Sequence, residues 1–251
     1  MEPVRSSRNP RVAEAIRLHR GRRRAETGCA LLEGPHLLAE AIEAGASIQT
    51  IFVAEDELDE SHIGPTQGVD QVVVSDSVMK RLAGTPHPRG PVAVIVIPPD
   101  EPETTRSLLV SWGVGDPGNV GTLIRSAAAF GLGFLAGPGT ADPWSPKVLR
   151  AGAGSHFRTA LERVPTLSVG ALQSRGYTVV ASVVEGGRSP ERLGDGGRYA
   201  VLVGDEGTGL PPEVIGEADI LITIPMKGNT ESLNAAVAGS LLAYELATRN
   251  P

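Results

Sequence analysis

The chain has 251 residues, of which 41% are hydrophobic and only 4% aromatic, and it carries a net charge of −6. This length and apolar content exclude a disordered or fibrous chain and allow one large domain or two modest ones with buried cores. The single cysteine, Cys29, excludes an intramolecular disulfide, no Cys/His spacing matches a zinc site, and no apolar run is long enough to cross a membrane, so we predict a cytoplasmic protein without a metal.

Most of the basic charge lies at the start of the chain. Residues 1–30 contain eight arginines and three glutamates, a local charge of +5, so residues 31–251 carry −11. Such a segment can neutralise several phosphates and give salt-dependent affinity for RNA without sequence specificity. A solubilising helix face explains the same pattern equally well. The RNA-binding residues that we predict from this segment are Arg5, Arg8, Arg11, Arg22, Arg23 and Arg24.

The first hundred residues alternate between helical and strand patterns. The expected helices are 8–24, 34–44 and 76–82, and the expected strands are 30–33, 48–53, 71–74 and 92–97. This alternation predicts a compact α/β domain over residues 1–98.

A proline-rich, acidic stretch follows, and it predicts a linker over residues 99–106. The second domain then covers residues 107–251. Its expected strands are 107–112, 133–135, 178–182, 199–203 and 220–224, and its expected helices are 120–130, 166–175 and 232–248. Continuous apolar strands joined by helices predict a mostly parallel sheet that is covered on both faces, so both domains belong to the α/β class.

Three glycine-rich turns follow strands of the second domain, where open parallel sheets bind ligands. The first, residues 113–125, contains the G-x-G-x-x-G spacing of dinucleotide-binding folds, but Pro117 removes a backbone N–H that would hold a pyrophosphate. No acidic residue ends the next strand to hold a ribose. Asn119 is the predicted N-cap of the following helix. Arg125 leaves the apolar face of that helix, where it either reaches an anion or lies in solvent.

The second turn follows the strand 199–203 and carries glycines at positions 204, 207 and 209. Its backbone can approach a flat ligand closely. Glu206 lies at the tip, either to orient a substrate or as an ordinary exposed side chain.

The third turn joins the strand 220–224 to the last helix, which we expect to begin near Ser232. Ser232 and Asn234 place hydrogen-bonding groups beside the unpaired N–H groups of the helix start. Taken alone, this is an ordinary capped helix. The apolar residues that we expect to face inward are Leu233, Val237, Leu241 and Tyr244.

Taken together and in this order, three segments resemble the signature motifs of the SpoU/TrmH branch of the SPOUT methyltransferases. They are D-P-G-N-V-G-T-L-I-R (116–125), G-D-E-G-T-G-L (204–210) and I-P-M-K-G-N-T-E-S-L-N (224–234). The N-terminal part is similar to the substrate-binding domain of that family, a ribosomal-protein-like α/β sandwich. The resemblance implies S-adenosylmethionine bound in a deep C-terminal trefoil knot, a homodimer, and methyl transfer to a ribose 2′-hydroxyl of RNA.

The resemblance also assigns residues. The catalytic positions are Asn119, Arg125, Glu206, Ser232 and Asn234. The cofactor-binding positions are Val203, Gly204, Glu206, Gly209, Ile224, Met226, Ser232 and Leu233. The family gives the deprotonation step to Arg125, but a guanidinium has no free acceptor. Stabilising the nascent alkoxide, or acting with a substrate phosphate as the base, fits its chemistry at least as well.

The leading prediction is therefore an RNA 2′-O-methyltransferase. Within the family that the chain resembles, a separate N-terminal domain implies ribosomal RNA (23S) rather than tRNA as the substrate. A tRNA enzyme, a self-protecting antibiotic-resistance methylase and a non-catalytic RNA-binding or ribosome assembly factor on the same fold are alternatives. The glycine spacing at 113–118 leaves a nicotinamide oxidoreductase as a further class.

Overall fold

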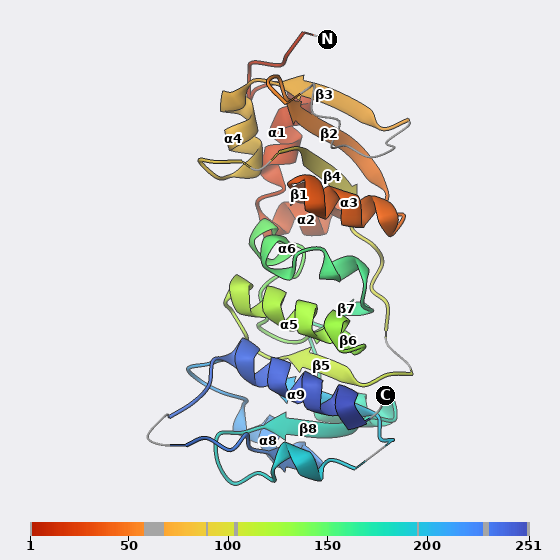
Figure 1. Ribbon diagram of the computed structural model, residues 1–251, viewed down its shortest axis with the longest axis vertical. Helices are drawn as coiled ribbons and strands as arrows, with labels where there is room; N and C mark the ends of the chain where they lie inside the picture. Colours follow the sequence, from red (N-terminus) through yellow and green to blue (C-terminus); the bar gives the residue numbers. More distant parts are fainter. Residues whose placement is uncertain are drawn as a thin grey trace. The chain divides into compact units, whose positions relative to one another are not determined.

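The computed structural model describes residues 2–57, 68–88, 90–102, 105–194, 196–227 and 231–249. The chain divides into two compact units (Figure 1). The first unit combines Met1–Pro99 with Trp144–Phe157, and the second combines Asp100–Pro143 with Arg158–Pro251. Each unit is built around one β-sheet.

The sheet of the first unit has four strands, in the order β1-β4-β2-β3. They are β1 (Cys29–Glu33), β4 (Val92–Val96), β2 (Ile48–Ala54) and β3 (Asp70–Val74). Only β2 and β3 pair in parallel. Because side chains alternate along a strand, Leu31 and Phe52 enter one core while Leu32 and Ile51 enter the other. The predicted α/β sandwich therefore has a core on each face of the sheet.

Helices cover both faces of this sheet. Residues of α1 (Pro10–Arg17) and α4 (Asp76–Ala83) belong to the core with Phe52. On the opposite face, α3 (Pro35–Glu43) shares its core with Trp144 and Leu149, which come from the region of α6 (Pro146–Gly152). Arg150 of α6 donates to the Glu33 carboxylate at the end of β1, at 2.8 Å. The fragment 144–157 thus completes the first unit, although it lies far along the chain.

The basic segment forms two helices, and the prediction of a single helix over residues 8–24 is wrong. Helix α1 ends next to its C-cap, Leu18, and α2 (Gly21–Thr27) begins after a short turn. Gly21 disfavours a continuous helix. The guanidinium of Arg24, which is only 4% exposed, donates to the Leu18 carbonyl at 2.6 Å and so satisfies an acceptor that the break leaves open.

The sheet of the second unit has six strands in the order β10-β8-β9-β5-β6-β7, and every neighbouring pair is parallel. The predicted parallel α/β architecture is confirmed. The strands are β5 (Leu108–Ser111), β6 (Gly133–Ala136), β7 (Leu161–Arg163), β8 (Thr178–Ser182), β9 (Tyr199–Val203) and β10 (Ile220–Ile222). The sequence did not indicate β7.

Helices cover both faces of this sheet too. On one face α5 (Pro117–Ala129) packs against α9 (Ala235–Arg249), and both contact the central strands (Figure 1). On the other face, α7 (Val169–Ser174) and α8 (Pro212–Glu217) share a core with the strands. Within the residues described, no helix is both long enough and apolar enough to cross a membrane.

The last helix buries a face other than the predicted one. Val237, Leu241 and Tyr244 are 48%, 46% and 53% exposed, so the expectation that they face inward is wrong. A Cβ on Gly239 would overlap Leu123 of α5, so a small residue there lets the two helices approach closely. The buried face of α9 instead consists of Ala235, Ala236, Gly239, Leu242, Ala243 and Leu246.

Candidate active site

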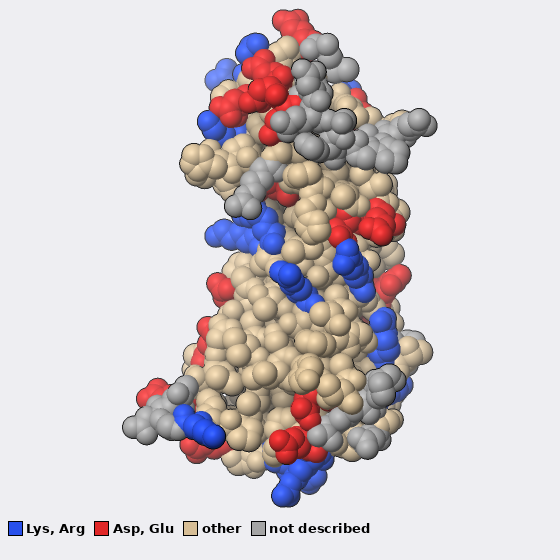
Figure 2. All heavy atoms as spheres, viewed as in Figure 1, with Lys and Arg blue, Asp and Glu red and all other residues tan. Residues whose placement is uncertain are grey.

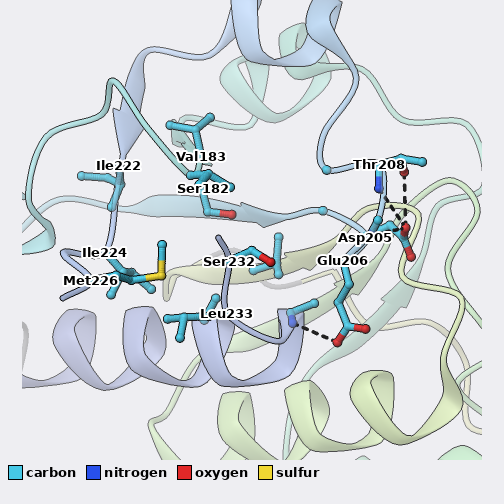
Figure 3. A pocket seen from close by; sticks show the side chains of 17 residues that line it. Ser182, Val183, Asp205, Glu206, Thr208, Ile222, Ile224, Met226, Ser232 and Leu233 are labelled. Carbon is cyan, nitrogen blue, oxygen red and sulfur yellow. Dashed lines mark hydrogen bonds between the residues drawn. The ribbon is translucent and has the colours of Figure 1, made fainter. Parts of the chain in front are cut away.

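A pocket of about 290 Å³ lies beyond the carboxyl ends of β8, β9 and β10, where the loops after these strands meet the start of α9 (Figure 3). The position is the one that open parallel sheets use for ligands. All eight residues predicted to bind the cofactor line this pocket: Val203, Gly204, Glu206, Gly209, Ile224, Met226, Ser232 and Leu233. None of the glycines at 113, 115 and 118, which match the dinucleotide pattern, belongs to this lining.

Sequence reasoning missed one wall of the pocket. Ser182 ends β8, and Val183 and Val184 follow it, so this wall comes from a turn without a signature motif. The available signal was the position alone, because the strand 178–182 was predicted and its carboxyl end lies at the ligand edge of the sheet. Residues 228–230 of the third motif and residues 103–104 of the predicted linker lie outside the described residues.

The turn after β9 requires glycine at two positions. A Cβ on Gly204 would lie 2.5 Å from the carbonyl carbon of Gly209, closer than atoms can approach without a shift of backbone. Gly209 has a φ of +68°, a conformation that side chains disfavour. The Gly209 N–H closes the turn on the carbonyl of Asp205 at 2.9 Å. The glycine pattern therefore shapes this rim of the pocket.

Asp205 stabilises the same turn from within. Its Oδ1 accepts the backbone N–H of Gly207 at 3.0 Å and that of Thr208 at 3.2 Å (Figure 3). These hydrogen bonds lower the pKa of the Asp205 carboxyl, because they favour its charged form. An asparagine side-chain oxygen can accept the same two hydrogen bonds.

A cluster of three polar residues, which we call the Glu206 node, joins three distant segments of the chain. It consists of Asn119, Glu206 and Asn234. Oε1 of Glu206 accepts from Asn119 Nδ2 at 2.7 Å, from the backbone N–H of Ala235 at 3.2 Å, and from Asn234 Nδ2. Asn234 Nδ2 also donates to Asn119 Oδ1 at 3.0 Å. The first turn of α5, the loop after β9 and the start of α9 therefore meet at one carboxylate.

Asn119 is not the N-cap of α5, contrary to the prediction. The helix begins at Pro117, and the cap is Asp116, whose carboxylate accepts the Asn119 N–H at 2.9 Å. Proline suits the first helical position because it has no N–H to satisfy. Asn119 therefore lies inside the first turn, where its amide is free to bind Glu206.

The two other predicted catalytic residues lie outside this node. Ser232 lines the pocket, and its hydroxyl bonds to no residue that the structure describes. Arg125 is exposed on α5, and no described side chain pairs with its guanidinium. Of the five predicted catalytic residues, the structure thus brings three into direct contact and places a fourth at the same pocket.

Most of the predicted RNA-binding arginines are paired with carboxylates. Side-chain N···O distances of 2.7–2.9 Å join Arg5 to Glu55, Arg11 to Asp70, Arg22 to Glu26 and Arg23 to Glu14. On the face drawn in Figure 2, acidic and basic side chains of the first unit lie side by side. Arg24 is buried, and its guanidinium donates to the Leu18 carbonyl instead of lying at the surface. Arg8 is exposed and has no acidic partner among the described residues.

The four arginines that pair with carboxylates can still bind RNA phosphates. Exposed ion pairs are worth about 0–1 kcal/mol, so a phosphate can compete for these guanidinium groups.

Among the described residues, no group of three His, Cys, Asp or Glu side chains could hold a metal ion.

Comparisons with known proteins agree with this fold. Residues 106–244 match the SpoU rRNA Methylase family, and residues 9–93 match the MRM3-like substrate binding domain. The fold and the pocket define a methyltransferase of the SPOUT class. The chain belongs to the SpoU rRNA Methylase family, as its three motifs predicted.

A full-length relative and two solved structures carry the comparison further. The 23S rRNA (guanosine(2553)-2′-O)-methyltransferase RlmP of Bacillus subtilis is 32% identical over 98% of this chain and 99% of its own length. The SpoU methyltransferase AviRb of Streptomyces viridochromogenes, in complex with AdoMet, has a TM-score of 0.87 at 25% identity, over 96% of this chain and 98% of that one.

An AdoMet-bound rRNA methyltransferase from Sinorhizobium meliloti has a TM-score of 0.85 at 26% identity, over 98% of this chain and 97% of that one. These likenesses confirm the fold class predicted from the sequence. The trefoil knot stays a prediction that the family implies.

Proposed function

We propose that this protein transfers the methyl group of S-adenosylmethionine to a ribose 2′-hydroxyl of 23S rRNA. The observation that carries the proposal is the convergence of the second and third motifs on one pocket, joined to the first motif by the Glu206 node. The full-length similarity to RlmP supports both the reaction and the class of RNA.

The pocket fits S-adenosylmethionine, which is the cofactor. Val183, Ile222, Ile224, Met226 and Leu233 line it with apolar groups suited to an adenosyl group (Figure 3). Glu206 adds a carboxylate that complements a positively charged sulfur. When bound, S-adenosylmethionine supplies a methyl group that is activated by the adjacent sulfonium. We propose that the eight predicted residues hold it.

Arg125 is an exposed cation on α5, the helix whose first turn carries Asn119 of the Glu206 node. A guanidinium remains charged at neutral pH and offers five donors, so it suits a phosphate or a developing alkoxide. Its exposure on α5 and its lack of a described partner leave those donors available. We therefore assign Arg125 to substrate binding or charge stabilisation.

The exposed apolar face of α9 supports a homodimer. Val237, Leu241 and Tyr244 are each about half exposed, and Tyr244 makes an edge contact with Phe130, which follows α5, at a centroid distance of 5.7 Å. In a two-fold interface between identical α9 faces, these three side chains would be buried on both subunits. Light scattering should give twice the 26.1 kDa of one chain, and a stable monomer would contradict the dimer.

The domain boundaries and the RNA-binding role of the first unit belong to the same proposal. We propose a substrate-binding domain over residues 1–98, a linker over 99–106 and a catalytic domain over 107–251, whose fragment 144–157 packs with the first unit. The match of residues 9–93 to a substrate-binding domain supports the first of these. The cytoplasm, where ribosomal RNA is modified in bacteria such as those of the relatives above, is the proposed compartment.

The direct test is a methylation assay. Purified protein is incubated with S-adenosylmethionine and either unmethylated 23S rRNA or tRNA, and the RNA is digested to nucleosides for mass spectrometry. A new 2′-O-methylribose in the rRNA supports the proposal, whereas a product in tRNA alone would favour the tRNA enzyme. Absence of both product and cofactor binding would favour a non-catalytic assembly factor.

A further inference from the structure

The first unit has a cavity that is distinct from the proposed cofactor pocket. It measures about 600 Å³ and lies between α1 and one face of the four-stranded sheet. The residues that line it fall between Pro10 and Val94, so the cavity belongs to this unit alone. Its volume is in the range of about 300–1,000 Å³ that is typical of small-ligand sites. The cavity is therefore large enough for a ligand of that size.

The floor of the cavity is apolar and comes from three strands. Cys29 of β1, Phe52 of β2 and Val94 of β4 line it, and they share a core with Leu18. Val96 lies on the same face of β4 as Val94, because side chains alternate along a strand, and it is 36% exposed. The helices that cover this face therefore leave part of the apolar sheet surface open.

Two polar side chains on β2 face this floor with unused hydrogen-bonding groups. Gln49 and Thr50 both line the cavity. The Cys29 thiol donates to Gln49 Oε1 at 3.6 Å, which leaves the two donors of the Gln49 amide nitrogen. Neither that nitrogen nor the Thr50 hydroxyl bonds to a residue in the described ranges. An apolar floor with a few directed polar groups suits a flat, partly polar ligand.

The rim of the cavity is rich in guanidinium groups. Arg11 and Glu14 of α1 line it. Arg11 pairs with Asp70 at 2.7 Å, and the Glu14 carboxylate accepts from both Arg17 and Arg23. All of these side chains are at least one third exposed, so an anion can compete for the three arginines. The rim therefore complements a negative charge next to the apolar floor.

We propose that this cavity receives one unstacked base of the RNA substrate, while the arginines of the rim hold a neighbouring phosphate. The inference rests on the proposed function, in which the first unit binds that RNA. Proteins read RNA sequence mainly from unstacked bases, whose faces pack against the protein and whose edges form hydrogen bonds. The floor offers the packing surface, Gln49 and Thr50 offer the hydrogen bonds, and the planar guanidinium of Arg11 can stack on a base.

The match to a substrate-binding domain supports this choice of ligand. Residues 9–93, which match that domain, contain the whole lining of the cavity except Val94. The segment 1–30, which supplies α1 and α2, also carries a local charge of +5. An apolar cavity beside a positively charged segment fits a nucleotide, which combines a flat base with a phosphate.

The test fills the cavity without changing its charge. Thr50→Phe adds a ring at the floor, and a strand tolerates an aromatic residue well. Binding to the full chain is measured by fluorescence anisotropy with two RNAs of equal length, a mixed-sequence single strand and a fully paired duplex. We expect affinity for the single strand to fall about 5–100-fold, the usual range for loss of one base contact. Affinity for the duplex should stay within about twofold, because its bases are paired and stacked.

The dependence on salt separates base contacts from phosphate contacts. Thr50→Phe should leave the slope of log K against log salt unchanged, since no charge is lost. Arg11→Ala should reduce the slope for single-stranded RNA by about 0.7, the contribution of one phosphate contact. A base pocket bordered by arginines requires both results.

Two further variants guard against misfolding and non-specific effects. Gln49→Ala removes an exposed amide, so the fold should persist, and single-strand affinity should fall about 2–10-fold for one lost hydrogen bond. Thr166→Phe places the same ring on an exposed loop of the second unit and should bind both RNAs as the wild type does. Urea unfolding of Thr50→Phe shows whether the first unit remains folded, and Gln49→Ala decides the matter if it does not.

The outcomes separate this inference from the proposed function. Wild-type affinity for the single strand in Gln49→Ala and in folded Thr50→Phe would overturn the base pocket and leave the proposed methyl transfer intact. An equal loss on single strand and duplex would also overturn the pocket, because a paired base cannot enter it. Conversely, the expected losses in a protein whose wild type methylates no ribose would overturn the proposed reaction and keep the pocket.

Discussion

The two sets of predicted functional residues behave differently in the structure. The eight positions predicted to hold the cofactor line one pocket of the second unit. The six arginines predicted to bind RNA in the first unit do not form one surface, since four pair with carboxylates and one is buried. Turn motifs constrain the backbone and therefore indicate where a ligand site lies in the fold. Charge composition gives only the mean charge of a segment, which neighbouring acidic side chains can neutralise.

The largest effect should come from adding one methyl group to the pocket turn. In Gly204→Ala the new Cβ would lie 2.5 Å from the carbonyl carbon of Gly209 and 2.6 Å from the Leu210 nitrogen, and backbone cannot move away cheaply. We expect destabilisation of about 2–4 kcal/mol in urea unfolding, together with loss of S-adenosylmethionine binding in calorimetry.

Gly216→Ala is the matched control for that change. Gly216 lies in α8, and a Cβ there meets nothing within 4 Å, so alanine should be neutral or should stabilise the helix by up to about 1 kcal/mol. Equal behaviour of the two variants would mean that the turn is not the constraint on the pocket.

Arg24 offers the corresponding test in the first unit. Its guanidinium donates to the Leu18 carbonyl at the break between α1 and α2, and Arg24→Ala would leave that acceptor without its donor. We expect a loss of about 1–3 kcal/mol in the free energy of unfolding, measured in urea. Arg22→Ala, which removes one exposed pair with Glu26, should change stability by less than about 0.5 kcal/mol. If Arg24→Ala instead weakened RNA binding without destabilising the protein, its assignment as a buried structural residue would fail.

The sequence was most informative where the backbone geometry tolerates only one type of residue. The strand ends and the glycine turn at 204–209 could be placed because only glycine tolerates the close approach and the positive φ found there. The buried face of α9 could not be predicted, because apolar periodicity marks Val237 and Leu241 as readily as the small residues that contact α5.

Partners that lie far apart along the chain also escaped prediction. Asn119 has the composition of a helix cap, and only the structure shows that Asp116 caps α5 and frees Asn119 for Glu206. Likewise, chain order alone could not show that residues 144–157 complete the core of the first unit. Spacing predicts local geometry, whereas these features depend on contacts between distant segments.

Arg8 provides a smaller test of RNA binding by the first unit. It is the exposed member of the predicted set without a described acidic partner, so its charge is available to a phosphate. Arg8→Ala should weaken RNA binding uniformly across sequences and reduce the slope of log K against log salt by about 1. Binding is measured by filter retention at several salt concentrations, with Arg24→Ala as a variant whose slope should not change. An unchanged slope in Arg8→Ala would remove that arginine from the RNA interface.

The smallest expected effect is a pH dependence of the pocket turn. Hydrogen bonds from the Gly207 and Thr208 N–H groups lower the pKa of Asp205 from its ordinary value of 3.8. A depressed carboxyl pKa contributes stability that is fully present above the unfolded pKa and is lost as the pH falls through the folded pKa. The melting temperature of the wild type should therefore approach that of Asp205→Asn as the pH falls below 3.8, with the wild type slightly higher at neutral pH. Because Asp205 is open to solvent, the difference should be small, and a gap that widens on acidification would mean that its charge does not stabilise the turn.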